Sequence, residues 1–222
     1  MKRTVFKLLI GLLTFVGLPL AAWGLSDTAG FFGQPARLSY VVMTVLMQVV
    51  IVVLMPDAGD WNTGRKTVRR QRVAMLLLMI LALALMVAAP WCDRRDIATF
   101  DGIEAARWTG LASYFIGMVL VHWAEAALGR QFSLEVTIQQ GHRLVTGGPY
   151  RWLRHPRYAG IIIYMAGVAL IFRSLAGLAL AAGTALVLLW RIRDEDELLR
   201  KEFGTEWDSW AGRTKRLVPF VY

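Results

Sequence analysis

The sequence predicts an all-α integral membrane protein with about four transmembrane helices followed by a C-terminal helical hairpin. Hydrophobic residues make up 56% of the 222 residues, and the mean hydropathy is +0.47. Soluble domains have about 45–50% apolar residues. The apolar residues fall in blocks of about 15–22 residues with almost no charge, the length that crosses a bilayer core. Because lipid cannot satisfy backbone polar groups, these blocks must be helical.

Four apolar blocks lie in the first 128 residues. The first, about Val5–Gly24, follows the basic residues of the N-terminus. A signal peptide is the alternative for this block, since small residues follow Leu20, but its length and the blocks after it favour a retained span. The other three blocks are about Ala36–Met55, Val73–Trp91 and Trp108–Leu128. We expect residues 1–128 to form transmembrane helices 1–4.

A longer apolar region, Tyr158–Trp190, is interrupted by Arg173-Ser174 and predicts a helical hairpin that turns there. Its first arm, Tyr158–Phe172, is about 22 Å long and therefore short for a full crossing. It either spans with Arg173 reaching the headgroups or stops short of them. The second arm has no proline from Leu175 to Phe203, until Gly204 provides a C-terminal stop. At about 43 Å it should emerge into the cytoplasm.

The distribution of basic residues predicts the orientation. With the N-terminus in the cytoplasm, 20 of the 25 Lys and Arg residues fall on the cytoplasmic side, as the positive-inside rule requires. The opposite side keeps Arg37, Arg94, Arg95, Arg107 and Arg173. We expect a multi-pass protein of a bacterial inner (plasma) membrane with both termini cytoplasmic. This placement also accounts for the net charge of +9, so no nucleic-acid partner is expected.

Several single residues carry weaker expectations. Cys92 is the one cysteine, which excludes an intrachain disulfide and a cysteine-based metal site, and we expect a free thiol in a loop. His122 and Glu125 share a helix face, and a structural hydrogen bond between them is favoured over a functional role. Trp207 and Trp210 lie in a basic tail, a pattern typical of the headgroup layer.

The chemistry-bearing residues lie in the last 90 or so residues. A loop rich in glycine and proline runs from His142 into the hairpin, and Pro156 fits the first turn of a helix. Further along, Arg191 and Glu195 are four residues apart on one helix face. They offer a bidentate cation and a carboxylate acceptor. These physical features alone slightly favour a structural interpretation over a ligand-binding site. In that interpretation the loop is an ordinary basic cytoplasmic loop, and Arg191 and Glu195 form a surface ion pair that contributes little to stability.

Two stretches resemble the isoprenylcysteine carboxyl methyltransferase family of integral membrane methyltransferases. The first is HRLVTGGPYRWLRHPRYAG, residues 142–160, and the second is RIRDEDELLRKEFGTEW, residues 191–207, followed by RLVP at 216–219. The resemblance covers roughly Leu128 to Pro219. It implies that residues 129–222 form the catalytic region, with a cofactor loop, the hairpin and a cytoplasmic tail.

The resemblance implies S-adenosyl-L-methionine as the cofactor, bound at the cytoplasmic face without a metal, and a lipophilic or lipidated acceptor that reaches the site from the bilayer. It places the arginine that binds the acceptor at Arg191. The implied cofactor contacts are His142, Arg143, Leu144, Val145, Tyr150, His155, Pro156, Arg157, Tyr158 and Glu195. The family's paired glutamates read Glu195-Asp196 here, and its tyrosine after Phe-Gly reads Trp207. Asp196 has a shorter reach and is left out of the site.

A carboxylate acceptor suits these residues, because it is ionised at pH 7 and needs no general base. Two alternatives stay open. One is an NADPH-dependent reductase of double bonds in sterol-like lipids, although the short loop offers little anchoring for a dinucleotide's extra phosphates. The other is a non-catalytic membrane accessory protein in which Arg191 and Glu195 are purely structural.

Overall fold

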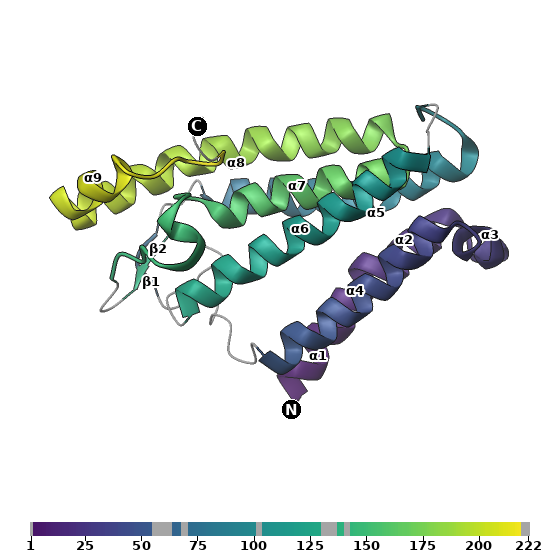
Figure 1. Cartoon of the computed structure of the whole chain (residues 1–222), viewed down its shortest axis with the longest axis horizontal. Coiled ribbons are helices and arrows are strands. Elements are labelled where there is room, and N and C mark those ends of the chain that lie inside the picture. The colour runs from purple at the N-terminus through teal and green to yellow at the C-terminus, as the bar shows by residue number, and fades with distance from the viewer. Residues whose placement is uncertain are drawn as a thin grey trace. The chain divides into compact units, whose positions relative to one another are not determined.

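The computed structural model describes residues 2–54, 64–67, 71–100, 104–129, 137–139 and 143–218 (Figure 1). The chain forms two compact units. Unit 1 contains residues 1–56, 80–116 and 162–184, and unit 2 contains residues 57–79, 117–161 and 185–222. The division expected at residue 128 concerns function and stays a prediction.

The first predicted span is a broken helix. Helix α1 (Lys2–Leu12) continues through a π-helical turn (η1, Leu13–Gly17) into α2 (Leu18–Trp23), and the chain breaks at Gly24, whose φ is 118°. A 3-10 turn (η2, Leu25–Asp27) and α3 (Thr28–Phe32) follow at an angle of 83° to the preceding helix. Only glycine adopts such a φ at little cost, so Gly24 sets the end of the predicted block.

Helix α4 (Pro35–Leu54) lies beside α1 in unit 1 (Figure 1). The Tyr40 hydroxyl donates to the backbone oxygen of Phe15 at 2.5 Å and the Thr44 hydroxyl is 2.8 Å from that of Tyr114. All three of these side chains are fully buried. Hydrogen bonds between helices are one of the forces that hold membrane helices together.

The remaining helices agree with the predicted spans and hairpin. They are α5 (Gln71–Arg95), α6 (Glu104–Leu128), α7 (Pro156–Ile171), α8 (Leu175–Phe203) and the short α9 (Thr205–Ala211). Within the described residues, α5, α6 and α8 are long and apolar enough to cross a membrane, and the bent N-terminal pair would be a fourth span. Helix α4, over residues 35–51, and α7 are shorter apolar helices. The predicted all-α class is confirmed.

The hairpin turns at the predicted residues. Arg173 adopts φ 46°, and the Ser174 hydroxyl accepts a hydrogen bond from the backbone N–H of Gly177 at 2.9 Å, which caps the start of α8. Helix α8 then runs over the predicted 29 residues and ends at Gly204, with φ 54°. A left-handed glycine at this position is the usual helix stop.

Two glycines let α6 and α7 approach closely within unit 1. A Cβ on Gly167 would lie 2.5 Å from the backbone nitrogen of Tyr114, and one on Gly110 would lie 2.7 Å from the backbone oxygen of Gly167. Small residues at such positions allow the backbones of membrane helices to pack directly.

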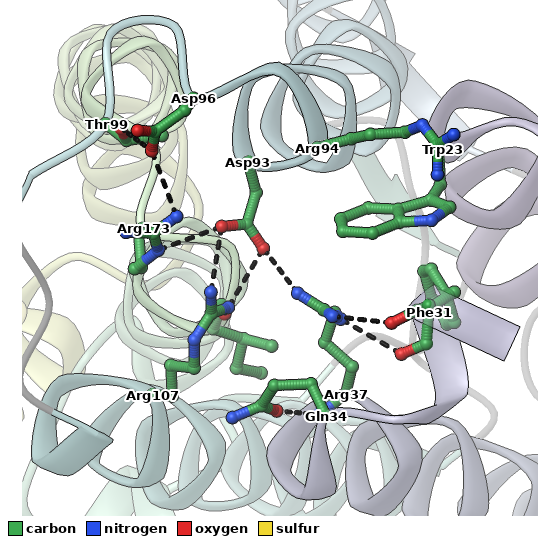
Figure 2. A network of polar contacts seen from close by, with 12 residues as sticks. Trp23, Phe31, Gln34, Arg37, Asp93, Arg94, Asp96, Thr99, Arg107 and Arg173 are labelled. Atoms are coloured by element: carbon green, nitrogen blue, oxygen red, sulfur yellow. Dashed lines mark hydrogen bonds and ion pairs between the residues drawn. The ribbon is translucent and has the colours of Figure 1, made fainter. Parts of the chain in front are cut away.

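Four of the five arginines expected on the non-cytoplasmic side form ion pairs. Figure 2 shows the three pairs that involve Asp93. The Asp93 side chain, 1% exposed, accepts from Arg37 at 2.8 Å, from Arg107 through both terminal nitrogens at 2.9 Å, and from Arg173 at 3.0 Å. Arg94 pairs with Asp27. The Asp93 carboxylate thus links α4, α5, α6 and the α7–α8 turn, and Arg173 is held by protein.

Each nitrogen of the Arg37 guanidinium donates a hydrogen bond. Its remaining nitrogens donate to the backbone oxygens of Phe31 at 3.0 Å and Gly30 at 2.8 Å, and its guanidinium lies 4.2 Å from the ring centroid of Trp23 (Figure 2). A buried charge is tolerated when it is paired and hydrogen-bonded in this way.

Two expectations about single residues are wrong. Cys92 lies within α5 and is buried, because that helix extends past the predicted end of the third span. Trp207 and Trp210 lie on α9 and are buried against Tyr150 and Ala124. Their indoles face the protein because α9 packs against Tyr150 and Ala124 within unit 2, which a count of aromatic and basic residues does not reveal.

Unit 2 also holds a short antiparallel ribbon. Strand β1 (Gly64–Thr67) pairs with β2 (Thr137–Gln139), with Gly64 opposite Gln139 and Thr67 opposite Thr137. Apart from this ribbon and isolated bridges, the regular structure of the described residues is helical.

Candidate active site

The loop that leads into α7 brings the predicted motif into a fixed shape in unit 2. A 3-10 turn (η4, Gly148–Arg151) begins at Gly148, whose φ is 58°. Pro156 is the first residue of α7, as predicted, and the backbone oxygen of His155 accepts from the N–H groups of Tyr158 and Ala159, both at 3.1 Å. Proline fits this first position because its missing N–H would have no partner within the helix.

Tyr158 connects the two motifs. Its hydroxyl donates to Glu195 Oε2 at 2.5 Å and accepts from Arg191 Nε at 2.8 Å. Tyr158 and Arg191 are buried, with Arg191 3% exposed, and Glu195 is half-buried. The Arg191 guanidinium also lies 5.8 Å from the centre of the Tyr158 ring. Arg191 is therefore an oriented, desolvated cation, unlike the exposed surface pair considered from the sequence.

His155 stacks on the ring of the same tyrosine. The two rings are nearly parallel, with an interplanar angle of 5° and a centroid distance of 5.5 Å. His155 Nε2 is 2.8 Å from Asp196 Oδ1, and Arg216 Nε donates to Asp196 Oδ2 at 3.0 Å. Asp196, which the sequence argument left out of the site, is thus buried against the motif histidine.

Arg157 faces a third helix. Its Nε donates to Glu125 Oε1 on α6 at 2.9 Å, and Glu125 Oε2 is 3.1 Å from His122 Nδ1. The predicted contact between His122 and Glu125 is therefore confirmed. Arg157 contacts the same carboxylate, so Glu125 links α7 to α6.

Tyr150 has its side chain in an apolar cluster. It packs with Trp207, Trp210 and Ala124, and burial raises the pKa of its phenol well above the ordinary value. The indole N–H of Trp210 donates to the backbone oxygen of Tyr150 at 3.0 Å. The buried phenol of Tyr150 thus stays protonated. The hydrogen bond to its backbone oxygen connects α9 to the motif loop.

The C-terminal tail is bound to the same loop. The N–H groups of Arg154 and His155 donate to the backbone oxygens of Lys215 and Arg216 at 2.7 and 3.0 Å. The Arg154 side chain donates to the backbone oxygens of Ala211 and Thr214 at 2.6 and 2.8 Å. The site is therefore built from the motif loop, α7, α8 and the tail.

The remaining predicted residues are placed less centrally. Leu144 and Val145 pack partly buried against the Tyr150 cluster, and Arg143 is exposed. His142 lies outside the described residues.

The structure thus brings His155, Tyr158, Arg191 and Glu195 together and adds Asp196 and Arg216. The adjacent acidic residues at 195 and 196 were the sequence signal for Asp196.

Comparison with known proteins identifies the family of this chain. A family described as "Phospholipid methyltransferase" matches residues 105–206. Protein-S-isoprenylcysteine O-methyltransferase B of Arabidopsis thaliana is 30% identical over 132 residues, which cover 57% of this chain and 67% of that protein. The chain belongs to the isoprenylcysteine carboxyl methyltransferase family. It is an integral membrane methyltransferase of that family.

Two further relatives show the breadth of the similarity. The solved structure of the eukaryotic intramembrane Ras methyltransferase ICMT has a TM-score of 0.56 and 18% identity, and covers 99% of this chain and 74% of that one, so it shows the shared fold. The nickel-cobalt-cadmium resistance protein NccN of Alcaligenes xylosoxydans xylosoxydans is 34% identical over 114 residues, 50% of this chain and 52% of that protein. The curated relatives described here are thus matched over about half to two thirds of their length.

The name of NccN raises the question of a metal in this family member. Within the described ranges, no group of three or more His, Cys, Asp or Glu side chains is arranged to hold a metal ion. His155 and Asp196 lie together, but the third group at that point is the cation of Arg216. A guanidinium repels metal ions, so this cluster is not suited to one.

Proposed function

We propose that this membrane methyltransferase uses S-adenosyl-L-methionine to methylate a carboxylate on a lipophilic acceptor at the cytoplasmic face. The observation that carries the proposal is the buried Arg191, oriented by the Tyr158 hydroxyl 2.8 Å away and one helical turn before Glu195. A guanidinium is the side chain best suited to hold a carboxylate in a fixed orientation. Arg191 is thus assigned to the acceptor.

The donor set of the site fits the proposed cofactor. When bound, S-adenosyl-L-methionine supplies a methyl group on a positively charged sulfonium. Its cationic groups are matched by the half-buried Glu195, and its carboxylate by Arg143 in the motif loop and Arg157 in the first turn of α7. Together with His142, Leu144, Val145, Tyr150, His155, Pro156 and Tyr158, these residues are the proposed cofactor contacts.

In this reaction the protein has to orient the acceptor carboxylate and remove water from around it. A carboxylate is already ionised at neutral pH, so no side chain has to remove a proton from it. Arg191 holds and directs the acceptor, and exclusion of water strengthens that contact. An acceptor with a lipid tail would remain in the bilayer while its head reaches the site, which accounts for placing such a site on transmembrane helices.

Basic-residue bias supports the cytoplasmic location. With both termini in the cytoplasm, 20 of the 25 Lys and Arg residues fall on that side. Four of the remaining five arginines form ion pairs, three of them with Asp93. We propose a bacterial inner membrane location in this orientation.

Isothermal titration of the purified protein tests the cofactor. We expect binding of S-adenosylhomocysteine, and weakening by about 1.5–3 kcal/mol in His155→Ala and Glu195→Ala, the range for loss of a hydrogen bond to a charged group. Glu197→Ala is the matched control, because Glu197 is an exposed carboxylate two residues away. Binding of NADPH alone would favour a reductase, and binding of neither ligand would favour a non-catalytic protein.

A further inference from the structure

Three residues from distant parts of the sequence form a closed set of contacts around the motif histidine. His155 Nε2 lies 2.8 Å from Asp196 Oδ1, and Arg216 Nε donates to Asp196 Oδ2 at 3.0 Å. The backbone oxygen of Arg216 also accepts from the N–H of His155 at 3.0 Å. His155 is 4% exposed and Asp196 is 6% exposed. The C-terminal tail therefore holds both the histidine and the carboxylate that contacts it.

This geometry determines which nitrogen of His155 carries a proton. An ionised carboxylate only accepts hydrogen bonds, so Nε2 must be the donor. The tautomer of a histidine is set by the hydrogen bond that one of its nitrogens makes. Among the described residues, no hydrogen bond is made to Nδ1, and the parallel Tyr158 ring restricts rotation of the imidazole. Nδ1 is left as the nitrogen available to a ligand.

Asp196 and Arg216 together fix the position of the imidazole. Asp196 contacts His155 through one carboxylate oxygen and pairs with Arg216 through the other. When an imidazole carries its proton on Nε2 alone, Nδ1 is a hydrogen-bond acceptor.

We propose that Asp196 and Arg216 are positioning residues, which hold the His155 imidazole with Nε2 donating to Asp196 and Nδ1 available to accept a hydrogen bond from the cofactor. The ligand rests on the proposed function, where the cofactor carries an ammonium group and ribose hydroxyls as donors. This role makes the C-terminal tail a part of the site.

Histidine NMR tests the tautomer without any ligand. The chain has three histidines, so ¹⁵N-histidine labelling with a His155→Gln variant identifies the His155 signals. We expect the Nε2–H tautomer in the parent and in Asp196→Glu, which keeps a carboxylate. Asp196→Asn can donate to Nε2 through its amide and should shift the population toward Nδ1–H. An Nδ1–H parent, or a signal unchanged in Asp196→Asn, would overturn the positioning role.

Cofactor affinity then tests the consequence. Asp196→Asn and Arg216→Gln should bind S-adenosylhomocysteine roughly 10- to 100-fold more weakly than the parent, as expected for a lost hydrogen bond to a charged group. Arg216→Lys should recover part of this loss. Lys215→Gln removes the neighbouring exposed charge of the same tail and should stay within about twofold. Equal effects at residues 215 and 216 would contradict the proposal.

The two proposals fail in different ways. If the parent does not bind S-adenosylhomocysteine, the proposed function is overturned, and with it the ligand assigned to Nδ1. If the parent binds it and Asp196→Asn binds equally well despite an altered His155 tautomer, the proposed function stands and the positioning role is overturned.

Discussion

The Tyr158 hydroxyl oxygen lies 2.8 Å from Nε of Arg191, and both side chains are buried. The same hydroxyl donates to Glu195 at 2.5 Å, so a single phenol orients the proposed acceptor-binding cation and contacts the carboxylate assigned to the cofactor. A fixed guanidinium of this kind is what a reaction limited by orientation requires.

Substitution of Arg191 separates holding the acceptor from holding the cofactor. Arg191→Lys keeps the charge and loses the planar fork, so turnover should fall about 30- to 1000-fold, the equivalent of about 2–4 kcal/mol of oriented contact. Affinity for S-adenosylhomocysteine should stay within a few-fold of the parent. Arg193→Lys, on an exposed position of the same helix, is the matched control. Near-parental turnover in Arg191→Lys would remove this residue from the site.

Tyr158→Phe tests whether the hydroxyl matters through Arg191. The variant keeps the ring that stacks on His155 and removes the hydroxyl's hydrogen bonds to Arg191 Nε and Glu195 Oε2. Loss of one partner of a buried hydrogen bond costs about 1–3 kcal/mol, so we expect turnover to fall about 5- to 100-fold. In Arg191→Lys the hydroxyl no longer has its Nε partner, and the double variant should therefore lose less than the product of the two single effects. Independent effects would argue against the coupling.

Asp93 should be the most sensitive acidic residue of unit 1. Its side chain is 1% exposed and faces Arg37, Arg107 and Arg173. Asp93→Asn leaves these cations without their shared anion, and breaking a buried pair costs about 3–5 kcal/mol. Thermal unfolding in detergent should show a large fall in Tm. Asp96→Asn, at a side chain 76% exposed that also contacts Arg173, should change Tm little. Similar Tm values for both variants would contradict the role of Asp93.

The close approach of α6 and α7 makes a second stability prediction. Gly167→Ala would place a Cβ 2.5 Å from the backbone nitrogen of Tyr114, and such overpacking costs about 1–3 kcal/mol. Gly183→Ala is the control, because its Cβ would meet Leu81 at an ordinary 3.6 Å. Alanine in place of a helical glycine there should be neutral or stabilising. The unfolding midpoint of each variant checks this, and a tolerated Gly167→Ala would refute direct backbone packing.

Orientation is best tested at Ile97, because Cys92 is buried and a poor target for a thiol reagent. Ile97 is 48% exposed just after α5. In a Cys92→Ala background, Ile97→Cys should react with an impermeant maleimide on intact cells. Ser209→Cys, at an exposed position of α9, should react only after permeabilisation. The reverse labelling pattern would overturn the proposed topology.

Local properties of the sequence were sufficient to predict the long apolar helices. Apolar block length and helix-stopping residues act within a few positions, so the hairpin turn at Arg173 and the span of α8 from Leu175 to Phe203 agree with the prediction. The two motifs also indicated His155, Tyr158, Arg191 and Glu195 as site residues, and the structure brings these four together.

Contacts between helices could not be predicted in the same way. Asp196 binds His155 across 41 positions, and Asp93 binds Arg37 across 56. A carboxylate shows from its sequence neighbours that it is acidic, but which cation it meets depends on how helices pack. The burial of Trp207 and Trp210 is a further example, since their neighbours suggest a membrane surface while α9 folds them against Tyr150. The sequence by itself thus determined the class, the helices and the motifs. Only the tertiary structure decided which polar side chains are buried together, because pairing and desolvation depend on distances between segments remote in the chain.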